Sequence, residues 1–290
     1  MSAVIIDGKA VAGGVREQIA QDVARMRDAG EAPPLLAVVL CNDNPASAIY
    51  VRNKERAAER AGMSFRLHTP PLDSSTESLV QLVHAINSDP GVDGMLVQLP
   101  LPAQVDAEAV GDAIAPEKDA DGFHPLNFGH LAEGRGATVV PGTPLGCMEL
   151  LRAYDIPVGG ARAVVIGRSV IVGRPMATLL LNADATVTVC HSRTRDLAAV
   201  CREADILISA MGRPRMVDAG FVKPGAAVID VGTTPEDGTV AGDVDRASVE
   251  PVAGWLSPVP GGVGPMTVAM LLRNTLALAA ARRSAVAAPG

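Results

Sequence analysis

A tyrosine and a lysine that could carry acid–base chemistry lie four residues apart in the stretch NPASAIYVRNK, residues 44–54. We expect a helix over about residues 46–61, and on a helix this spacing places Tyr50 and Lys54 on one face. A lysine amine has an ordinary pKa of about 10.4, so Lys54 could act as a base near neutral pH only where burial or a cationic neighbour lowers its pKa. The plainer interpretation is a solvated lysine among neighbouring arginines and acids.

Polar groups that could work beside this lysine follow two other segments. Gln98 stands at the end of the apolar run GMLVQLPLP, where its amide could orient a lysine or a ligand carbonyl, or simply cap a strand. Asp119 and Asp121 lie in the polar segment PEKDADGFHPLN. An ionised carboxylate there can accept two parallel N–H bonds from an amidine-like heterocycle edge. The alternative for either aspartate is an ordinary turn residue.

The stretch AVVIGRSVIVGRP, residues 163–175, indicates a short buried strand, a glycine turn and a helix start. This is the first βα unit of a dinucleotide-binding fold, in which glycine lets the backbone approach a pyrophosphate and the helix N-terminus presents free N–H groups. Gly167 and Gly173 are separated by five residues, unlike the usual G-x-G-x-x-G pattern. Any buried strand–turn–helix could need two glycines, so the turn alone leaves both interpretations open.

The end of the next expected strand bears on the choice of dinucleotide. In dinucleotide folds this strand usually ends in an acid that holds the adenosine ribose hydroxyl. Here it ends in His191-Ser192-Arg193-Thr194, with no acid. A hydroxyl and a guanidinium suit the phosphate of NADP, and Arg168 in the glycine turn could share that charge. We therefore expect NADP rather than NAD, with a polar, solvated strand end as the alternative.

A stiff segment, PVPGGVGP at residues 258–265, precedes the last helical pattern. Its prolines and glycines suggest a backbone wall for a flat ligand, although a rigid linker is also possible. The histidines show no metal or catalytic-triad spacing. The cysteines follow no metal-ligand spacing either, so we expect free thiols and no metal site. They are Cys41, Cys147, Cys190 and Cys201.

Apolar runs that predict buried strands alternate with helical patterns along the chain. Strands are expected at residues 35–40, 94–102, 163–166, 185–190, 205–210 and 226–232. Helices are expected at 8–29, 46–61, 79–86, 107–114, 145–154, 197–203 and 266–281, with Thr143 capping the fifth. The segment 116–131 is expected to be irregular, and the tail from Ala281 to be frayed.

This alternation predicts an α/β protein with two lobes flanking a cleft. The first domain would be residues 1–140, and the C-terminal helix, 265–290, would return to pack on it. The second domain, 141–264, would be a Rossmann-like, doubly wound parallel sheet. The cleft between the lobes would hold the ligand.

Composition narrows the class of partner. The net charge is −7 and there is no basic run, which argues against nucleic acid and anionic membrane surfaces. No apolar run approaches the ~20 residues of a membrane helix, and no secretory leader is evident. Hydrophobic residues make up 48% of the chain and aromatic residues only 2%, which suits buried parallel strands of aliphatic residues. We expect a soluble, cytoplasmic protein.

Taken together, these stretches closely resemble the bifunctional methylenetetrahydrofolate dehydrogenase/methenyltetrahydrofolate cyclohydrolase family. The matching segments occur in chain order over nearly the whole sequence, which is far more specific than any one motif. They are residues 44–54, 93–102, 116–127, 141–146, 164–175, 190–194 and 258–267.

The resemblance implies specific roles. Lys54 would be the catalytic lysine of the cyclohydrolase step, Tyr50 would stack on the folate, Gln98 would hold Lys54 and tune its protonation, and Asp121 would bind the pterin amidine edge. The folate site would also include Leu99, Pro260, Gly261 and Gly262. The residues matching NADP-contacting positions are Gly167, Arg168, Ser169, Ser192 and Thr233.

The implied chemistry is oxidation of methylenetetrahydrofolate, then hydrolysis of the methenyl product to formyltetrahydrofolate, in one-carbon metabolism that serves purine biosynthesis. The family is usually a homodimer. Two residues depart from it: Asn42 stands where glycine is common, and Gly142 where cysteine is common. Asn42 is expected to be mild because asparagine tolerates a left-handed backbone, whereas Gly142 removes a side chain at the domain junction.

Two rival interpretations remain beside this one, and a third, the short-chain dehydrogenases, fails. A dehydrogenase lacking the cyclohydrolase step is disfavoured by the joint presence of Lys54, Tyr50 and Gln98. A folate- or nucleotide-binding protein without turnover is disfavoured by intact candidate residues in both sites. The Tyr-x-x-x-Lys spacing also occurs in short-chain dehydrogenases, but there the nucleotide turn precedes the pair, whereas here it follows by more than a hundred residues.

Overall fold

The computed structural model describes residues 2–135, 138–236 and 238–287, with side chains as far as 284. The chain forms two compact units. Unit 1 comprises residues up to 13 together with 141–270, and unit 2 comprises 14–140 together with residues from 271 onward. Two long helices, α1 (Gly8–Asp28) and α10 (Gly264–Ala287), contribute residues to both units.

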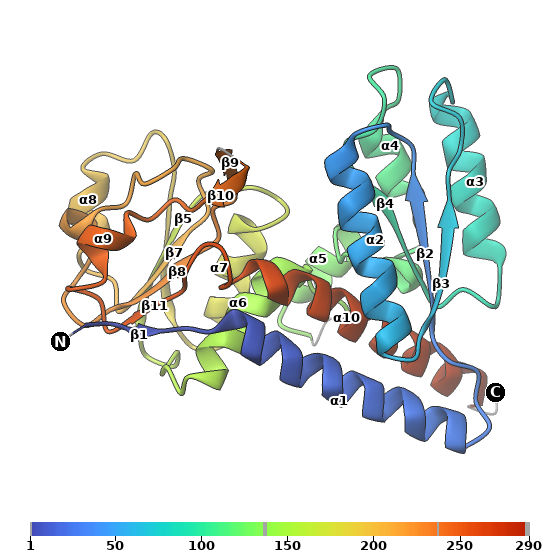
Figure 1. Ribbon diagram of the computed structural model, residues 1–290, viewed down its shortest axis with the longest axis horizontal. Helices are drawn as coiled ribbons and strands as arrows, with labels where there is room; N and C mark the ends of the chain where they lie inside the picture. The colour runs from blue at the N-terminus through green and yellow to red at the C-terminus, as the bar shows by residue number, and fades with distance from the viewer. Residues whose placement is uncertain (1, 136–137, 237, 288–290) are drawn as a thin grey trace. The chain divides into compact units, whose positions relative to one another are not determined.

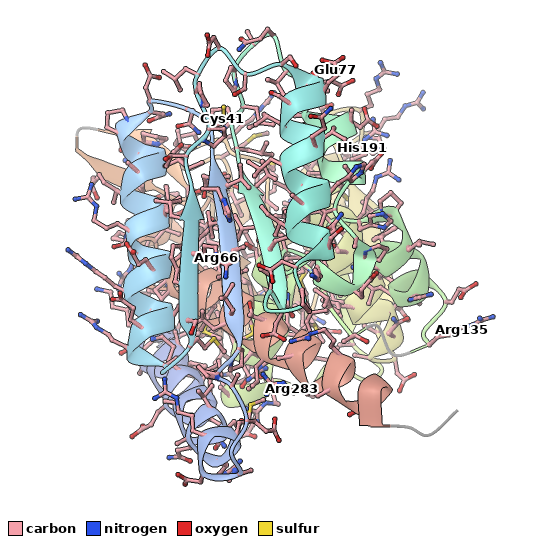
Figure 2. The ribbon with its side chains drawn as sticks, turned by 90° about the vertical axis from the view of Figure 1, so that its right-hand side faces the viewer. Cys41, Arg66, Glu77, Arg135, His191 and Arg283 are labelled. Atoms are coloured by element: carbon pink, nitrogen blue, oxygen red, sulfur yellow. The ribbon has the colours of Figure 1, made fainter. Side chains whose placement is uncertain are left out.

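Unit 2 is built on a three-stranded parallel sheet of order β3-β2-β4. Its elements are β2 (Leu35–Leu40), α2 (Pro45–Arg60), β3 (Ser64–His68), α3 (Thr76–Ser88), β4 (Gly94–Gln98), α4 (Ala107–Asp112), η1 (Pro116–Lys118) and α5 (Pro125–Ala132). Helices α2 and α3 lie on opposite sides of the sheet, and Arg66 marks β3 at its edge (Figures 1 and 2). The core beneath α3 and α4 joins Leu79, Val83 and Val110 to Val39 and Met95 of the sheet.

The C-terminal part of α10 belongs to unit 2, as the sequence predicts for a helix that returns to the first lobe. Asn274 donates hydrogen bonds to the Ala120 and Val140 carbonyls (2.9 and 2.8 Å). Arg282 forms an ion pair with Asp93, which is only 2% exposed and also accepts the Leu35 N–H. These contacts attach the helix to the starts of β2 and β4 and to the polar loop after η1.

Unit 1 contains a six-stranded parallel sheet of order β1-β11-β8-β7-β5-β6. Its elements are β1 (Val4–Ile5), α6 (Gly142–Ala153), β5 (Arg162–Ile166), α7 (Gly173–Asn182), β6 (Thr186–Cys190), α8 (Leu197–Cys201), β7 (Ile206–Ser209), η2 (Ala219–Phe221), β8 (Ala227–Asp230), the antiparallel pair β9 (Thr234–Glu236) and β10 (Thr239–Ala241), α9 (Arg246–Val249) and β11 (Trp255–Leu256).

The chain in unit 1 winds in two directions from β5. It moves outward to β6 on one side and then, through β7, to β8 and β11 on the other. Figure 1 shows α6 and α7 on one side of these strands and α8 and α9 on the other. The sheet is therefore doubly wound, as predicted, and its strand order reverses between β5 and β7. In folds of this kind ligands bind at the carboxyl ends of the strands where the order reverses.

Several local expectations are wrong. The segment 116–131, expected to be irregular, contains η1 and α5, because His124 caps α5 and Pro125 occupies its first position. Thr143 does not cap α6; its hydroxyl bonds that of Thr267 at 3.0 Å. Helix α10 continues to Ala287, so the tail is not frayed from Ala281; residues 288–290 lie outside the described part.

The short strands β1, β3 and β9–β11 and the short helix α9 were not expected at all, because their runs are too short or too exposed to show a period. Within the described ranges, no helix combines the length and apolar character that a membrane span requires.

Two glycines permit the tight strand–turn–helix of unit 1. Gly167 has φ +124°, and a Cβ there would lie 2.4 Å from the Ala210 carbonyl oxygen. A Cβ on Gly173 would lie 2.3 Å from the Gly167 carbonyl oxygen. Both neighbours are backbone atoms that cannot rotate away, so α7 can start this close to β5 only through glycine.

We expect Gly173→Ala to lower the free energy of unfolding by about 2 kcal/mol or more, because the added methyl overlaps fixed backbone. Urea denaturation followed by circular dichroism measures this. Gly14→Ala is the matched control: this helical glycine has open space at its Cβ, so alanine should be neutral or stabilise by about 0.5–1 kcal/mol. Equal stability of the two variants would contradict the close-packing argument.

Candidate active site

The lysine predicted to do chemistry is held by a glutamine from another element. Lys54 projects from α2, and its Nζ donates a hydrogen bond of 2.9 Å to Oε1 of Gln98 at the end of β4. The Gln98 Nε2 donates to the Leu99 carbonyl at 2.8 Å. This second bond fixes the amide so that its oxygen faces the lysine. The structure therefore brings Lys54 and Gln98 together as the resemblance implied.

The charge state of Lys54 is shifted by its surroundings. Burial lowers the pKa of Lys54, and the negative charge of Asp121 opposes that shift. The converse holds for Asp121, whose pKa is raised by burial, lowered by Lys54 and raised by Asp119. A buried amine with a lowered pKa can exchange a proton closer to neutral pH than an ordinary lysine can.

The two aspartates of the polar loop have different roles. Asp119 is buried and accepts three local hydrogen bonds, from the Gly122 and His124 N–H groups (2.9 and 2.8 Å) and from Asn127 Nδ2 (3.0 Å). Its oxygens are therefore committed to the loop, so Asp119 positions the segment that carries Asp121. Sequence reasoning identified neither Asn127 nor Asn274 as supports of this loop, because the bonds they make depend on the fold.

Tyr50 and Leu99 lie on the same unit with exposed side chains, 56% and 50% respectively. Asn42 lies nearby, and its backbone is not left-handed, so the reason given for its tolerance is wrong. Instead its side chain donates to the Pro100 carbonyl (2.8 Å) and accepts from the Asn44 N–H (3.1 Å). Asn42 thus links the loops that follow β2 and β4, next to Gln98.

Unit 1 has a pocket where the strand order reverses. Its volume is about 290 Å³, and its walls come from the carboxyl ends of β5, β6 and β7. Of the five residues predicted to contact a dinucleotide, three line it: Gly167, Arg168 and Ser192. His191, labelled in Figure 2, also contributes. None of the described residues lining this pocket is acidic, which agrees with an anionic ligand.

The other two predicted residues are placed differently. The Ser169 hydroxyl accepts hydrogen bonds from the Val172 and Gly173 N–H groups (3.1 and 3.3 Å), at the start of α7. Thr233 is exposed in the loop after β8 and is not part of the pocket wall. Ser169 therefore has a structural role in the turn, which a sequence pattern does not distinguish from ligand contact.

Two buried carboxylates that the sequence analysis missed organise the loops around this pocket. Asp230 at the end of β8 accepts from the Gly232, Asp243 and Val244 N–H groups (2.9–3.0 Å). Burial raises the pKa of Asp230 to about 6, although those N–H groups oppose the shift. Asp243 is fully buried and accepts from the Ser209 hydroxyl and two backbone N–H groups. Their local signals are weak: Asp230 ends β8 two residues before Gly232, and Asp243 directly follows Gly242.

The segment predicted to form a wall, Pro260 to Gly262, belongs to unit 1. The Gly262 N–H donates to the Pro258 carbonyl at 2.7 Å, which closes a turn. The chain also passes so near the start of α1 that a Cβ on Gly8 would lie 1.8 Å from the Gly262 carbonyl oxygen. The segment is thus a close-packed turn.

Comparisons with known proteins agree with this geometry. Residues 6–121 match the family described as "Tetrahydrofolate dehydrogenase/cyclohydrolase, catalytic domain", and residues 141–283 match its "NAD(P)-binding domain". "Bifunctional protein FolD" from Acidiphilium cryptum is 56% identical over 98% of this chain and 100% of its own length. The protein of the same name from Koribacter versatilis is 50% identical over 98% and 99%.

Solved structures show the same fold. The bifunctional methylenetetrahydrofolate dehydrogenase/cyclohydrolase from Campylobacter jejuni has a TM-score of 0.94 and 43% identity, covering 97% of this chain and 100% of its own. The Trypanosoma brucei enzyme, solved with NADP cofactor and inhibitor, has a TM-score of 0.93 and 41% identity, covering 99% and 100%.

The matched regions extend through both units and cover the stretches that carry Lys54, Gln98 and the glycine turn. The chain therefore belongs to the tetrahydrofolate dehydrogenase/cyclohydrolase family, and it is a bifunctional enzyme of folate one-carbon chemistry with an NAD(P)-binding domain.

Proposed function

We propose that this enzyme oxidises 5,10-methylenetetrahydrofolate with NADP and hydrolyses the methenyl product to 10-formyltetrahydrofolate through Lys54. The observation that carries the proposal is the 2.9 Å hydrogen bond between Lys54 and Gln98, joined to the burial that lowers the pKa of this amine. A dehydrogenase without the second activity would have no need of a lysine in such surroundings.

Hydrolysis requires a proton to leave the attacking water and a proton to reach the departing ring nitrogen. Lys54 can serve both needs, because a neutral amine accepts the first and the resulting ammonium donates the second. Gln98 keeps the amine in place, and its oxygen stabilises the ammonium form. Asp121 binds the amidine edge of the pterin, Tyr50 stacks on it, and Leu99 completes the part of the folate site that unit 2 supplies.

The pocket of unit 1 suits a part of the dinucleotide. Gly167, Arg168 and Ser192 line a cavity without described acids at the point where the strand order reverses, and we assign Ser169 and Thr233 to its rim. The nicotinamide, when bound, supplies the hydride acceptor. The protein's own part in that step is to position both ligands and to exclude water. The absence of an acid at residues 191–194, directly after β6, favours NADP over NAD, and the Trypanosoma brucei relative was solved with NADP.

We assign one ligand to each of the two domains. We assign folate binding to residues 1–140 with the C-terminal helix 265–290, and dinucleotide binding to 141–264. We also place the enzyme in the cytoplasm, in accord with its four buried free cysteines.

We propose that two copies form a homodimer through β6. This strand is an outer strand of the unit 1 sheet and pairs only with β5 among the described strands. It exposes Val189 (41%), and Leu181 on the adjoining helix α7 is 60% exposed. An edge strand with exposed apolar side chains favours pairing with another chain.

Lys54→Met should separate catalysis from binding. We expect loss of methenyltetrahydrofolate hydrolysis by about 100-fold or more, the usual contribution of a general acid–base group. Folate and NADP affinities should change little. Hydrolysis is measured as the disappearance of the methenyl compound, and oxidation is measured as the formation of NADPH.

Lys223→Met is the matched control for this variant, since Lys223 is a surface lysine paired with Asp205, and it should keep both activities. Hydrolysis that survives in Lys54→Met would show that another group transfers the proton. A wild type that reduces NADP but never hydrolyses would support a dehydrogenase alone. Binding of both ligands with neither reaction would support a binding protein.

The pH profile of hydrolysis should report the electrostatic interaction between Lys54 and Asp121. Asp121 raises the pKa of Lys54 against the lowering effect of burial, so Asp121→Asn should lower that pKa further. Because the neutral amine is the required base, the rising limb of the kcat–pH profile for hydrolysis should move to lower pH. Asp43→Asn, at an exposed acid before α2, should leave the limb in place. A rising limb that stays in place in Asp121→Asn would contradict the role of Lys54 as the base whose pKa Asp121 raises.

Measuring the oligomeric state tests whether β6 forms the dimer interface. Sedimentation equilibrium should give twice the chain mass of 29.8 kDa, and Val189→Lys should shift the protein towards monomer because it buries a charge in the interface. Leu67→Lys, on the exposed face of edge strand β3 in unit 2, should remain dimeric. Dissociation by Leu67→Lys but not by Val189→Lys would move the interface to β3.

A further inference from the structure

The loop after β7 supplies a wall of the cofactor pocket that the sequence analysis did not consider. Ala210, Met211, Arg213 and Met216 from this loop line the pocket, opposite residues that follow β5 and β6. Arg213 is the cation in this group. Together with Arg168 it gives the pocket two guanidinium groups and, among its described lining residues, no acid, in a chain whose net charge is −7.

The guanidinium of Arg213 has no described partner within the protein, whereas the next arginine along the chain is paired. Arg215, two residues further on, pairs through both of its terminal nitrogens with Glu236. No carboxylate in the described ranges pairs with Arg213, which is exposed on the pocket side of the loop. A free guanidinium fork matches the geometry of a phosphate.

The backbone of Arg213 is held rigidly by Asp243. Its N–H donates to Asp243 Oδ1 at 2.7 Å, while Oδ2 accepts from the Met211 N–H at 2.7 Å and from the Ser209 hydroxyl at 3.1 Å. A fully buried carboxylate with these donors fixes the loop. The arginine therefore loses little backbone freedom when its side chain binds a ligand.

The topology indicates which part of the dinucleotide Arg213 meets. The pyrophosphate belongs at the glycine turn and the start of α7, whereas the adenosine ribose belongs at the end of the second strand of the unit, here β6. Arg213 shares a pocket with Ser192 at that strand end. Because Arg213 and Ser192 line one pocket, a phosphate on the ribose 2′-position would lie in the space that both residues border.

We propose that Arg213 determines cofactor specificity: its guanidinium binds the 2′-phosphate of NADP together with Ser192. This assignment rests on the proposed preference for NADP. It makes the loop after β7, in addition to the loop after β6, part of the discrimination against NAD.

Binding measured without turnover tests the assignment. Isothermal titration of the full-length enzyme with NADP, NAD, 2′,5′-ADP and 5′-AMP is compared for wild type, Arg213→Gln and the matched control Arg215→Gln. Arg213→Gln should weaken NADP and 2′,5′-ADP about tenfold or more, the loss expected for a charge-assisted hydrogen bond. NAD and 5′-AMP should stay within about twofold, and Arg215→Gln should leave all four within that range, as expected for an exposed ion pair. Arg213→Lys, which keeps the charge but loses the fork, should fall between wild type and Arg213→Gln.

Three results would overturn it. Equal weakening of NADP and NAD by Arg213→Gln would place the guanidinium on a part common to both, such as the adenine ring. A wild type that prefers NADP while Arg213→Gln keeps the whole preference would assign the 2′-phosphate to other residues and leave the proposed cofactor intact. A wild type that binds NADP and NAD equally would contradict the NADP preference itself.

Discussion

A lysine amine can exchange protons near neutral pH only where its pKa is lowered, and at Lys54 in unit 2 burial lowers it. Burial disfavours its charged form, while Asp121 and the Gln98 oxygen favour it. The balance leaves an amine that can both accept and return a proton. Each partner comes from a different element, α2, β4 and the loop after η1, so the parallel sheet of unit 2 must be complete before the lysine has its chemistry.

Both units use parallel strands in the same way. The proposed functional residues stand at or just beyond the carboxyl ends of strands: Gln98 is the last residue of β4 in unit 2, and Gly167, Ser192 and Arg213 follow β5, β6 and β7 in unit 1. Side chains and free N–H groups converge at those ends because the strands run in one direction. The buried interiors of the strands can then be built almost wholly from aliphatic residues, which accounts for a core with few aromatic side chains.

Loop position is set in both units by carboxylates that bind backbone N–H groups. Asp119 holds the turn that carries Asp121, and Asp243 holds the turn that carries Arg213. A buried carboxylate is stable only where several donors satisfy it. Removing one donor would therefore weaken the whole turn, and the functional side chain depends on a neighbour that never touches the ligand. Sequence reasoning considered Asp119 as a candidate ligand group, because it lies beside Asp121, and it missed Asp243.

The sequence by itself determined the α/β class, the parallel core strands, the amphipathic helices and, through ordered motifs, the family with Lys54, Gln98 and the glycine turn. Those features depend on local periodicity and residue type, which are visible in the amino-acid sequence. The tertiary structure decided the rest: that Asp119 is a support, that the Ser169 hydroxyl accepts the Gly173 N–H at the start of α7, that Asn42 bonds Pro100, that α5 is a helix, and that Arg213 lines the pocket while Arg215 pairs with Glu236. Each of these depends on a hydrogen bond or packing contact that only the folded geometry of its unit creates, and neighbouring residues of the same type have different roles according to what the fold places beside them.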